Sequence, residues 1–321
     1  MRAMQVTAYD QPLKMQDLEM PMPGPGEVLV KVETCGLNFG DLLLIKGTYQ
    51  EKPPLPFTLG MELAGTVTAV GKGVQGVAKG QRIAAYSGFH GLAEYAVVPA
   101  DICVAIPDEM NAVDAAAFLI AYGTSHVALE YKARLQPGER LLVLGASGGV
   151  GLTAVELGKL MGAEVIACAR GQAKLDICRA AGADHLIDSE VDDIREVVKS
   201  LGGADVVYDP IGGDQFKAAM RACNPEARLL PLGFASGEVP QIPANIVMVK
   251  NLNILGLFWG GYKKFNPKVL TDSFRTLIDW YVAGQLKPHV SHVLPLEQAN
   301  EALDLLRTRK ATGKVIVRVS G

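Results

Sequence analysis

The chain has 321 residues, of which 49% are hydrophobic and 20% are charged, and its formal net charge at pH 7 is −3. These values are typical of a soluble globular protein, and the length suits two domains better than a single core. The small negative charge provides no basic surface, which argues against nucleic acid or a membrane as a partner.

The cysteines and the N-terminus indicate the compartment. Five cysteines are scattered along the chain without a C-x-x-C pair, which argues against both a disulfide framework and a zinc cluster. The first residues contain no apolar run typical of a signal peptide, and no segment is apolar for long enough to cross a bilayer. We therefore expect a cytoplasmic protein.

The first third of the chain, to about residue 107, alternates short strands with turns. The turn Pro23–Gly26 precedes a predicted strand at 27–34, and a further strand beginning at Thr66 ends in Gly71-Lys72-Gly73. This spacing predicts a β-rich, barrel-like domain.

The middle of the chain has a different pattern. After a helical stretch at 112–134 and a turn at 136–139, strands alternate with helices. Predicted strands lie at 140–144, 164–168, 184–187, 204–208, 227–232 and 253–258. Six strands with helical spacers predict an α/β fold with a doubly wound parallel sheet.

The C-terminal tail leaves that sheet. Helical patterns at 267–283 and 297–307 precede a last strand at 314–319, and we expect this tail to rejoin the first domain. The predicted division is therefore a β-rich domain at 1–118 and 261–321 around an inserted α/β domain at 119–260.

A glycine-rich turn follows the first strand of the α/β region, in the run from Gly145 to Gly151. Gly148 and Gly149 leave no Cβ between the backbone and a pyrophosphate, and the helix that follows directs its free N–H groups at the anion. Ser147 and Val150 lie in the same turn and are predicted cofactor contacts. The spacing is a variant of the Rossmann fingerprint. The alternative is a turn of the same shape that holds no ligand.

The end of the second strand indicates which dinucleotide binds there. An NAD site usually carries an acid at this point, whereas a 2′-phosphate requires cations. The chain instead has Arg170 and, one helical turn later, Lys174. A guanidinium and an ammonium favour NADPH as the cofactor. The alternative is that both are solvated side chains at a helix start.

Several motifs together resemble a known family. They are Pro23–Val30, Gly36–Asp41, Gly60–Gly65, Gly145–Gly151 and Ala311–Val315. They are similar to the zeta-crystallin-like quinone oxidoreductase branch of the medium-chain dehydrogenase/reductases. The resemblance covers nearly the whole chain. It implies a GroES-like substrate domain around an inserted Rossmann domain, NADPH as reductant, and often a homodimer.

The sequence departs from the zinc alcohol dehydrogenases of the same superfamily. The positions of their catalytic zinc ligands are Asn38, Met61 and Ala121 here, and none is a normal zinc donor. We therefore expect no metal. Glu62 is retained from the zinc-enzyme motif without the zinc ligands that accompany it there, and it is interpreted as a structural salt-bridge residue. His289 and His292 lie in a strand-like context that does not suit metal ligation.

Without a Lewis acid, reduction of an electron-poor acceptor is easier than oxidation of an alcohol. A quinone or activated alkene takes hydride directly, and the protein stabilises the developing phenolate or enolate. The resemblance implies catalytic roles for Asn38, Asp41 and Tyr49. Packing of Tyr49 on nearby prolines is an equally natural alternative. A second tyrosine of the family is replaced at or next to Leu44.

The resemblance also implies further cofactor contacts. Asn38 is expected beside the nicotinamide, and Thr124 near its ribose or amide. The other predicted contacts follow the later strands of the sheet and are Pro210, Phe234, Ala235, Phe258, Trp259 and Gly260. Phe258 and Trp259 are equally suited to dimer packing.

Three functions remain open from the sequence. The first is an NADPH-dependent quinone or enone reductase. The second is a 2-enoyl-CoA reductase, suggested by Tyr49, for which Lys263 and Lys264 are the only cation pair that suits a CoA tail. The third is a nucleotide-binding protein with a structural or RNA-binding role, against which the acidic net charge argues.

Overall fold

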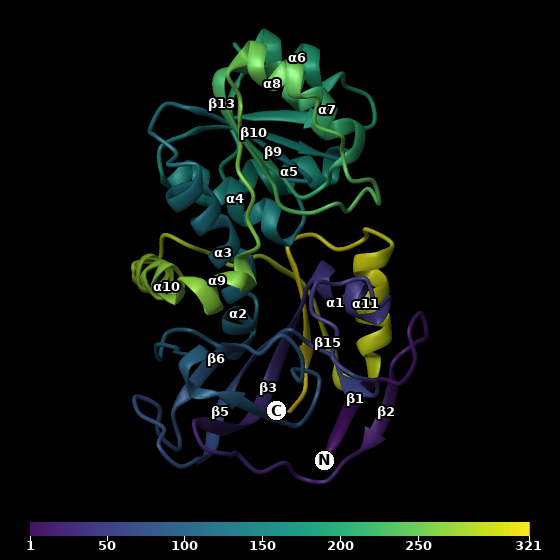
Figure 1. Cartoon of the computed structure of the whole chain (residues 1–321), viewed down its shortest axis with the longest axis vertical. Helices are drawn as coiled ribbons and strands as arrows, with labels where there is room; N and C mark the ends of the chain where they lie inside the picture. The colour runs from purple at the N-terminus through teal and green to yellow at the C-terminus, as the bar shows by residue number, and fades with distance from the viewer. Residues whose placement is uncertain (321) are drawn as a thin grey trace. The chain divides into compact units, whose positions relative to one another are not determined.

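The computed structural model describes residues 1–320, and the chain forms two compact units. Unit 1 comprises Met1–Ile120 and Ile278–Gly321, and unit 2 comprises Ala121–Leu277. In Figure 1 the purple and blue N-terminal strands share unit 1 with the yellow C-terminal segment, whereas the teal and green residues form unit 2. The chain therefore leaves unit 1 once and returns to it.

Unit 1 is built on two mainly antiparallel sheets, in which only the pair β15–β16 is parallel among the described strands. Its elements are β1 (Arg2–Val6), β2 (Lys14–Asp17), β3 (Glu27–Leu37), α1 (Phe39–Ile45), β4 (Phe57–Thr58), β5 (Glu62–Val70), β6 (Arg82–Tyr86), β7 (Tyr95–Pro99), η1 (Ala100–Ile102), β8 (Cys103–Ala105), α2 (Ala112–Ala116), β15 (Val290–Pro295), η4 (Leu296–Gln298), α11 (Ala299–Arg307) and β16 (Lys314–Arg318). The larger sheet has the order β15-β16-β3-β5-β6-β8, with β7 also paired to β3, and the smaller has the order β2-β1-β4.

The long strand β3 organises unit 1. It pairs with β5, β7 and the C-terminal strand β16. Its apolar residues are buried along most of its length, as expected for a central strand. Gly36 lies at its end, where a Cβ would be 1.9 Å from the carbonyl oxygen of Ala116. The absence of a side chain at Gly36 lets α2 pack directly on the strand.

Unit 2 is a doubly wound α/β unit. Its elements are α3 (Leu119–His126), η2 (Val127–Lys132), β9 (Arg140–Leu144), α4 (Gly149–Leu160), β10 (Glu164–Ala169), α5 (Gln172–Ala180), β11 (His185–Asp188), α6 (Ile194–Ser200), β12 (Ala204–Asp209), α7 (Gly213–Ala222), β13 (Cys223–Pro231), α8 (Ala244–Lys250), β14 (Asn253–Ile254), η3 (Trp259–Gly261), α9 (Tyr262–Phe265) and α10 (Pro267–Val282). Two of these, α3 and α10, cross the boundary between the units.

The sheet of unit 2 has the strand order β11-β10-β9-β12-β13-β14, and every pair is parallel. This is the Rossmann order, so the predicted fold class is confirmed. Leu142, Ile166 and Val207 are fully buried in its core, which explains why these strands are almost continuously apolar.

The structure differs from two sequence expectations. The predicted strand at 253–258 ends at Ile254, because only Asn253 and Ile254 pair with β13. The predicted helical stretch at 112–134 is helical over most of its length, but it is divided into α2, α3 and the π-helical segment η2. Both differences arise from tertiary pairing and packing, to which residue periodicity is not sensitive.

The return to unit 1 falls at Ile278, whereas the sequence pattern predicted it at residue 261. The intervening residues pack within unit 2. The rings of Trp259 and Phe274 meet edge to face at 5.9 Å, and Ser273 hydrogen-bonds the buried His126 at 2.9 Å. These contacts explain why η3, α9 and most of α10 belong with unit 2.

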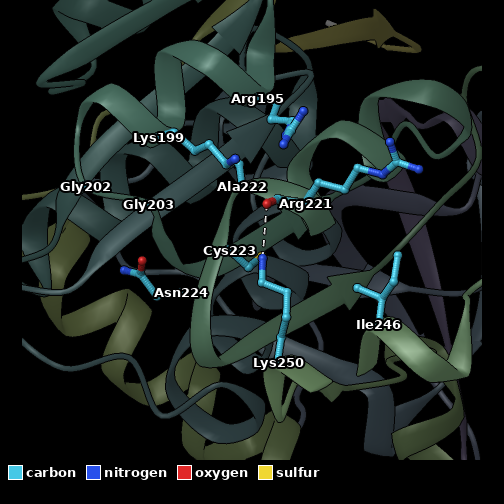
Figure 2. Close-up of a pocket in the computed structure, with 10 residues that line it drawn as sticks. All are labelled: Arg195, Lys199, Gly202, Gly203, Arg221, Ala222, Cys223, Asn224, Ile246 and Lys250. Atoms are coloured by element: carbon cyan, nitrogen blue, oxygen red, sulfur yellow. Dashed lines mark hydrogen bonds between the residues drawn. The ribbon is translucent and has the colours of Figure 1, made fainter. Parts of the chain in front are cut away.

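A pocket of about 580 Å³ opens where β12 and β13 begin (Figure 2). Residues from α6, α7 and α8 line it together with the Gly202-Gly203 turn. Nucleotides bind in this fold at the carboxyl ends of the strands. The pocket lies at the opposite edge of the sheet.

No helix among residues 1–320 is both long enough and apolar enough to cross a membrane.

Candidate functional site

The glycine-rich turn of unit 2 connects β9 to α4. Gly145 adopts a left-handed conformation with φ +58°, and Gly148 is the N-cap of α4. A Cβ on Gly151 would lie 2.2 Å from the carbonyl oxygen of Gly145, so only glycine permits this close approach. The first N–H groups of α4 have no partner within the helix and form a ready site for a phosphate. The geometry of the turn therefore fits a pyrophosphate.

The two cations predicted to select NADPH lie at the end of the neighbouring strand. Arg170 follows β10 directly, and Lys174 is in the first helical turn of α5. The Nε of Arg170 lies 3.3 Å from an Oε1 of Glu190, and both side chains are about half exposed. A 2′-phosphate therefore has to compete with Glu190 for this guanidinium, at small cost because exposed ion pairs are weak.

The carboxyl ends of β12 and β13 bring further predicted residues to the same edge. The buried carboxylate of Asp209 accepts hydrogen bonds from the backbone of Ile211 and Gly212, and burial raises its pKa to about 6. Ala235 donates its N–H to the carbonyl oxygen of Pro210 at 3.1 Å. A Cβ on Gly145 would be 2.6 Å from Ile211, so the two loops are in contact.

The remaining predicted cofactor residues differ in exposure. Phe258 is 41% exposed, as is Phe234 at 39%, whereas Trp259 is only 6% exposed. A Cβ on Gly123 would lie 2.9 Å from the Trp259 ring, which shows how closely that ring packs against α3. Thr124 is partly exposed on the same helix, and Gly260 is buried. Trp259 is therefore part of the core of unit 2.

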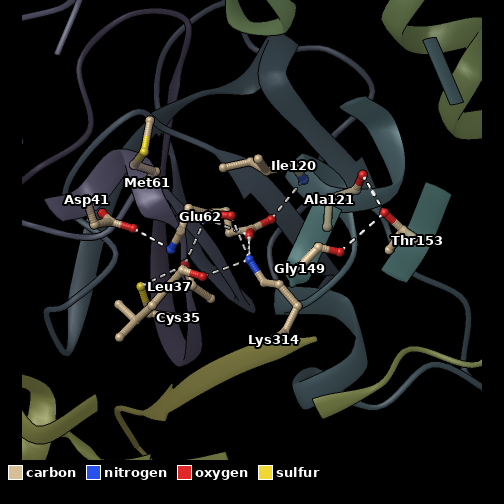
Figure 3. A network of polar contacts seen from close by, with 12 residues as sticks. Cys35, Leu37, Asp41, Met61, Glu62, Ile120, Ala121, Gly149, Thr153 and Lys314 are labelled. Carbon is tan, nitrogen blue, oxygen red and sulfur yellow. Dashed lines mark hydrogen bonds and ion pairs between the residues drawn. The ribbon is translucent and has the colours of Figure 1, made fainter. Parts of the chain in front are cut away.

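A buried polar network occupies unit 1 (Figure 3). The ammonium of Lys314, on β16, donates to Oε1 of Glu62 at 2.6 Å, to Oδ1 of Asn38 at 2.7 Å and to the carbonyl oxygen of Leu37 at 3.0 Å. The side chains of Lys314 and Glu62 are 5% and 1% exposed. The second carboxylate oxygen of Glu62 accepts the N–H of Ile120 at 3.0 Å. All three ammonium hydrogens thus have acceptors, as a buried charge requires.

The network fixes the orientation of Asn38. Its amide nitrogen donates to Glu62 at 2.9 Å and to the carbonyl oxygen of Gly36 at 3.2 Å, and its amide oxygen accepts from Lys314. A primary amide has only two N–H donors, and both are engaged. This geometry therefore holds the Asn38 side chain in one orientation at the start of α1.

Asp41 supports the same helix from inside. Its Oδ2 accepts the backbone N–H of Asn38 at 2.8 Å. The residue is completely buried, and its Oδ1 has no hydrogen-bond partner among residues 1–320. Burial is the main reason that the pKa of Asp41 rises to about 7.

The donors present do not fit a catalytic zinc. Asn38 is held by the positive charge of Lys314, Met61 offers only a thioether, and Ala121 has no donor in its side chain. Within residues 1–320 no three His, Cys, Asp or Glu side chains form a metal-binding group. His289 instead lies 3.0 Å from the hydroxyl of Thr312.

Two tyrosines form a polar pair that the sequence pattern does not predict. The hydroxyl groups of Tyr49 and Tyr86 are hydrogen-bonded, and burial raises the pKa of both. Tyr86 ends β6, where it pairs in register with Glu62 of β5. A Cβ on Gly40 would be 2.7 Å from the Met61 sulfur and 3.4 Å from the Tyr49 ring, so these side chains converge around Gly40. No local sequence signal identifies Tyr86, because only the β5–β6 register brings it to the site.

Comparisons with known proteins agree with this organisation. Residues 24–108 match the Alcohol dehydrogenase GroES-like domain, and residues 149–282 match the Zinc-binding dehydrogenase domain. The chain is 40% identical over 98% of its length to a quinone oxidoreductase-like protein 2 homolog of Nematostella vectensis, of which it covers 88%.

Solved structures give the same result. The quinone oxidoreductase of Thermus thermophilus, solved also in complex with NADPH, matches with a TM-score of 0.88 and 31% identity over 99% of this chain and 100% of that one. A mycobacterial protein complexed with NADPH matches with a TM-score of 0.93 and 29% identity over 99% of both chains. The chain belongs to the zinc-independent quinone oxidoreductase branch of the medium-chain dehydrogenase/reductase superfamily, and it is an oxidoreductase.

Proposed function

We propose that this protein uses NADPH to reduce quinones or other electron-poor alkenes without a metal. The observation that carries the proposal is the hydrogen-bonded Tyr49–Tyr86 pair, which lies in a unit where Asn38 and Met61 stand at zinc-ligand positions. A hydroxyl donor can stabilise the oxyanion that forms when a quinone or enone accepts a hydride.

The residues of unit 2 fit NADPH. Ser147, Gly148, Gly149 and Val150 surround the N-terminus of α4 and would hold the pyrophosphate. Arg170 and Lys174 would hold the 2′-phosphate. The bound cofactor supplies the hydride. The NADPH complexes of the similar solved proteins support NADPH as the cofactor. The further proposed contacts are Thr124, Pro210, Phe234, Ala235, Phe258, Trp259 and Gly260.

The residues of unit 1 have distinct proposed roles. Tyr49 donates its hydroxyl hydrogen to the oxygen of the quinone or enone. Tyr86 donates to the oxygen of Tyr49, and this hydrogen bond opposes the rise that burial causes in the pKa of Tyr49. Asn38 and Asp41 hold the first turn of α1, whose Gly40 lies against Tyr49. The catalytic contribution of Asn38 and Asp41 is then positional.

A 2-enoyl thioester reductase is the second candidate, because the same tyrosine donor suits a thioester enolate. Steady-state NADPH oxidation with 9,10-phenanthrenequinone and with crotonyl-CoA, compared as kcat/KM, distinguishes the two substrates. NADPH binding without turnover of either would instead support a non-enzymatic, nucleotide-binding role.

Substitution of the tyrosines tests the mechanism. We expect Tyr49→Phe to lower kcat by about 100-fold and Tyr86→Phe by about 10-fold, because each removes one hydroxyl from the donor pair. The Kd for NADPH should not change, since neither tyrosine is among the predicted cofactor contacts. Tyr95→Phe, on β7, is the control for loss of a hydroxyl elsewhere in unit 1. Full kcat of Tyr49→Phe with both acceptors would contradict the proposed role.

The family resemblance also leads us to propose a homodimer in the cytoplasm. The edge strand β14 of unit 2 is short, and within the described part of the chain it pairs only with β13. Met248 and Val249, at the end of α8, are 71% and 74% exposed. Apolar side chains beside a free strand edge suit an interface between two copies of the chain. Sedimentation equilibrium at the mass of a monomer would refute the dimer.

A further inference from the structure

The pocket where β12 and β13 begin is lined by basic side chains from three helices (Figure 2). Arg195 and Lys199 belong to α6, Arg221 to α7 and Lys250 to α8. The other lining residues are Gly202, Gly203, Ala222, Cys223, Asn224 and Ile246. The lining thus carries four positive charges and no carboxylate.

These cations differ from others on unit 2. Lys159 and Lys217 lie within 3.0 Å of carboxylate oxygens, and Arg140 lies 3.0 Å from Glu164. Among residues 1–320, no carboxylate is within ion-pair distance of Lys199, Arg221 or Lys250, and the only acid near Arg195 is its exposed neighbour Glu196 at 3.7 Å. Asp205 accepts a hydrogen bond from the lining residue Asn224 at 2.8 Å, so one carboxylate lies beside four cations and the pocket keeps an excess of positive charge.

Part of the cluster has a structural explanation. The ammonium of Lys250 donates to the carbonyl oxygens of Met220 and Arg221 at 3.2 and 3.1 Å, and so caps the end of α7. This interaction does not account for Arg195, which lies at the beginning of α6. Its Nε is buried without a hydrogen-bond partner among the described residues. The positive charges of Lys199 and Arg195 also act on Lys250, whose pKa is lowered mainly by burial.

We propose that this pocket binds a small molecule carrying two phosphate groups, at a site separate from the NADPH site. The volume of about 580 Å³ is within the range of small-molecule sites. One phosphate carries a charge of about −1.5 to −2 at pH 7, so two phosphates match four cations better than one. Guanidinium forks and ammonium groups together are the donors typical of phosphate recognition.

Inorganic pyrophosphate is the probe. It is titrated calorimetrically into the protein in saturating NADP⁺, which occupies the glycine-rich turn. We expect saturable binding of one pyrophosphate per chain, with orthophosphate and sulfate binding at least about tenfold more weakly because each carries fewer charges. Arg195→Gln with Lys199→Gln should weaken pyrophosphate binding by about 100-fold, or about tenfold for each cation removed.

The matched control is Arg179→Gln with Lys217→Gln, which removes two charges from α5 and α7 outside the pocket. It should bind pyrophosphate as the unchanged protein does. If the pocket double variant does not fold, Lys199→Glu alone, at an exposed position, replaces it and should also weaken binding.

Three results would overturn the proposal. One is no saturation of the unchanged protein by about 1 mM pyrophosphate. Another is equal weakening by the pocket and control variants, which would indicate only a diffuse charge effect. The third is a protein that does not bind free pyrophosphate but co-sediments with phosphatidylserine vesicles. If that co-sedimentation requires Arg195 and Lys199, the pocket binds a lipid surface instead.

Discussion

Replacing Lys314 with methionine removes the positive charge from the buried network of unit 1 while keeping an unbranched side chain. The variant loses the three hydrogen bonds that the ammonium donates, to Glu62, Asn38 and the carbonyl oxygen of Leu37. Glu62, only 1% exposed, then keeps the N–H of Ile120 and the amide of Asn38 but no cation.

The magnitude follows from this burial. Removing one partner of a buried ion pair leaves an uncompensated charge and typically costs about 3–5 kcal/mol. We expect a loss in that range for Lys314→Met. Glu62→Gln removes the negative charge instead and leaves the ammonium of Lys314 unpaired. In the double variant neither charge remains, and the new amide oxygen at position 62 can still accept from Ile120, so the combined loss should be smaller than the sum by about 2 kcal/mol.

Urea denaturation of the four proteins measures these values as a double-mutant cycle. Tryptophan emission is a suitable signal because Trp280 belongs to unit 1 and Trp259 to unit 2. Lys268→Met is the control, since Lys268 pairs with Asp272 on the exposed face of α10 and should contribute less than about 0.5 kcal/mol. The reasoning would be refuted if Lys314→Met lowered the free energy of unfolding by less than about 1 kcal/mol. It would also be refuted if the losses of the two single variants summed to the loss of the double variant.

Two further predictions concern charge. The folded-state pKa of Asp41, about 7, lies above its ordinary value of 3.8, so its contribution to stability is fully present below about pH 4 and is lost as the pH rises to 7. Between about pH 4 and pH 7 the free energy of unfolding of the unchanged protein should therefore fall by up to about 4 kcal/mol relative to that of Asp41→Asn. Urea titrations of both proteins at several pH values measure this difference, and its absence would contradict the burial argument. Arg170→Ala with Lys174→Ala should weaken NADPH binding by about 2–4 kcal/mol and leave NADH nearly unchanged, as fluorescence titration of both cofactors can show. Equal losses for the two cofactors would contradict 2′-phosphate recognition.

Features that depend on short segments could be predicted from the amino-acid sequence. The strand at 140–144, the glycines that follow and the cations after the next strand lie within about 35 residues, and their local geometry requires particular residue types. The chemical identity of Asn38 and Met61 is likewise enough to show that ordinary zinc donors are missing at two of the ligand positions.

Contacts between residues that are distant in the sequence could not be predicted and are visible only in the folded chain. Lys314 reaches Glu62 across 252 residues of sequence, and strand register places Tyr86 in the same region of unit 1. The last strand of unit 2 ended earlier than its β-branched and apolar residues predicted, since it has a pairing partner over only two residues. Composition and periodicity describe a residue and its near neighbours in the sequence. Burial, strand register and charge pairing arise from the whole fold, and they set the environment of Asp41, Tyr49 and Lys314.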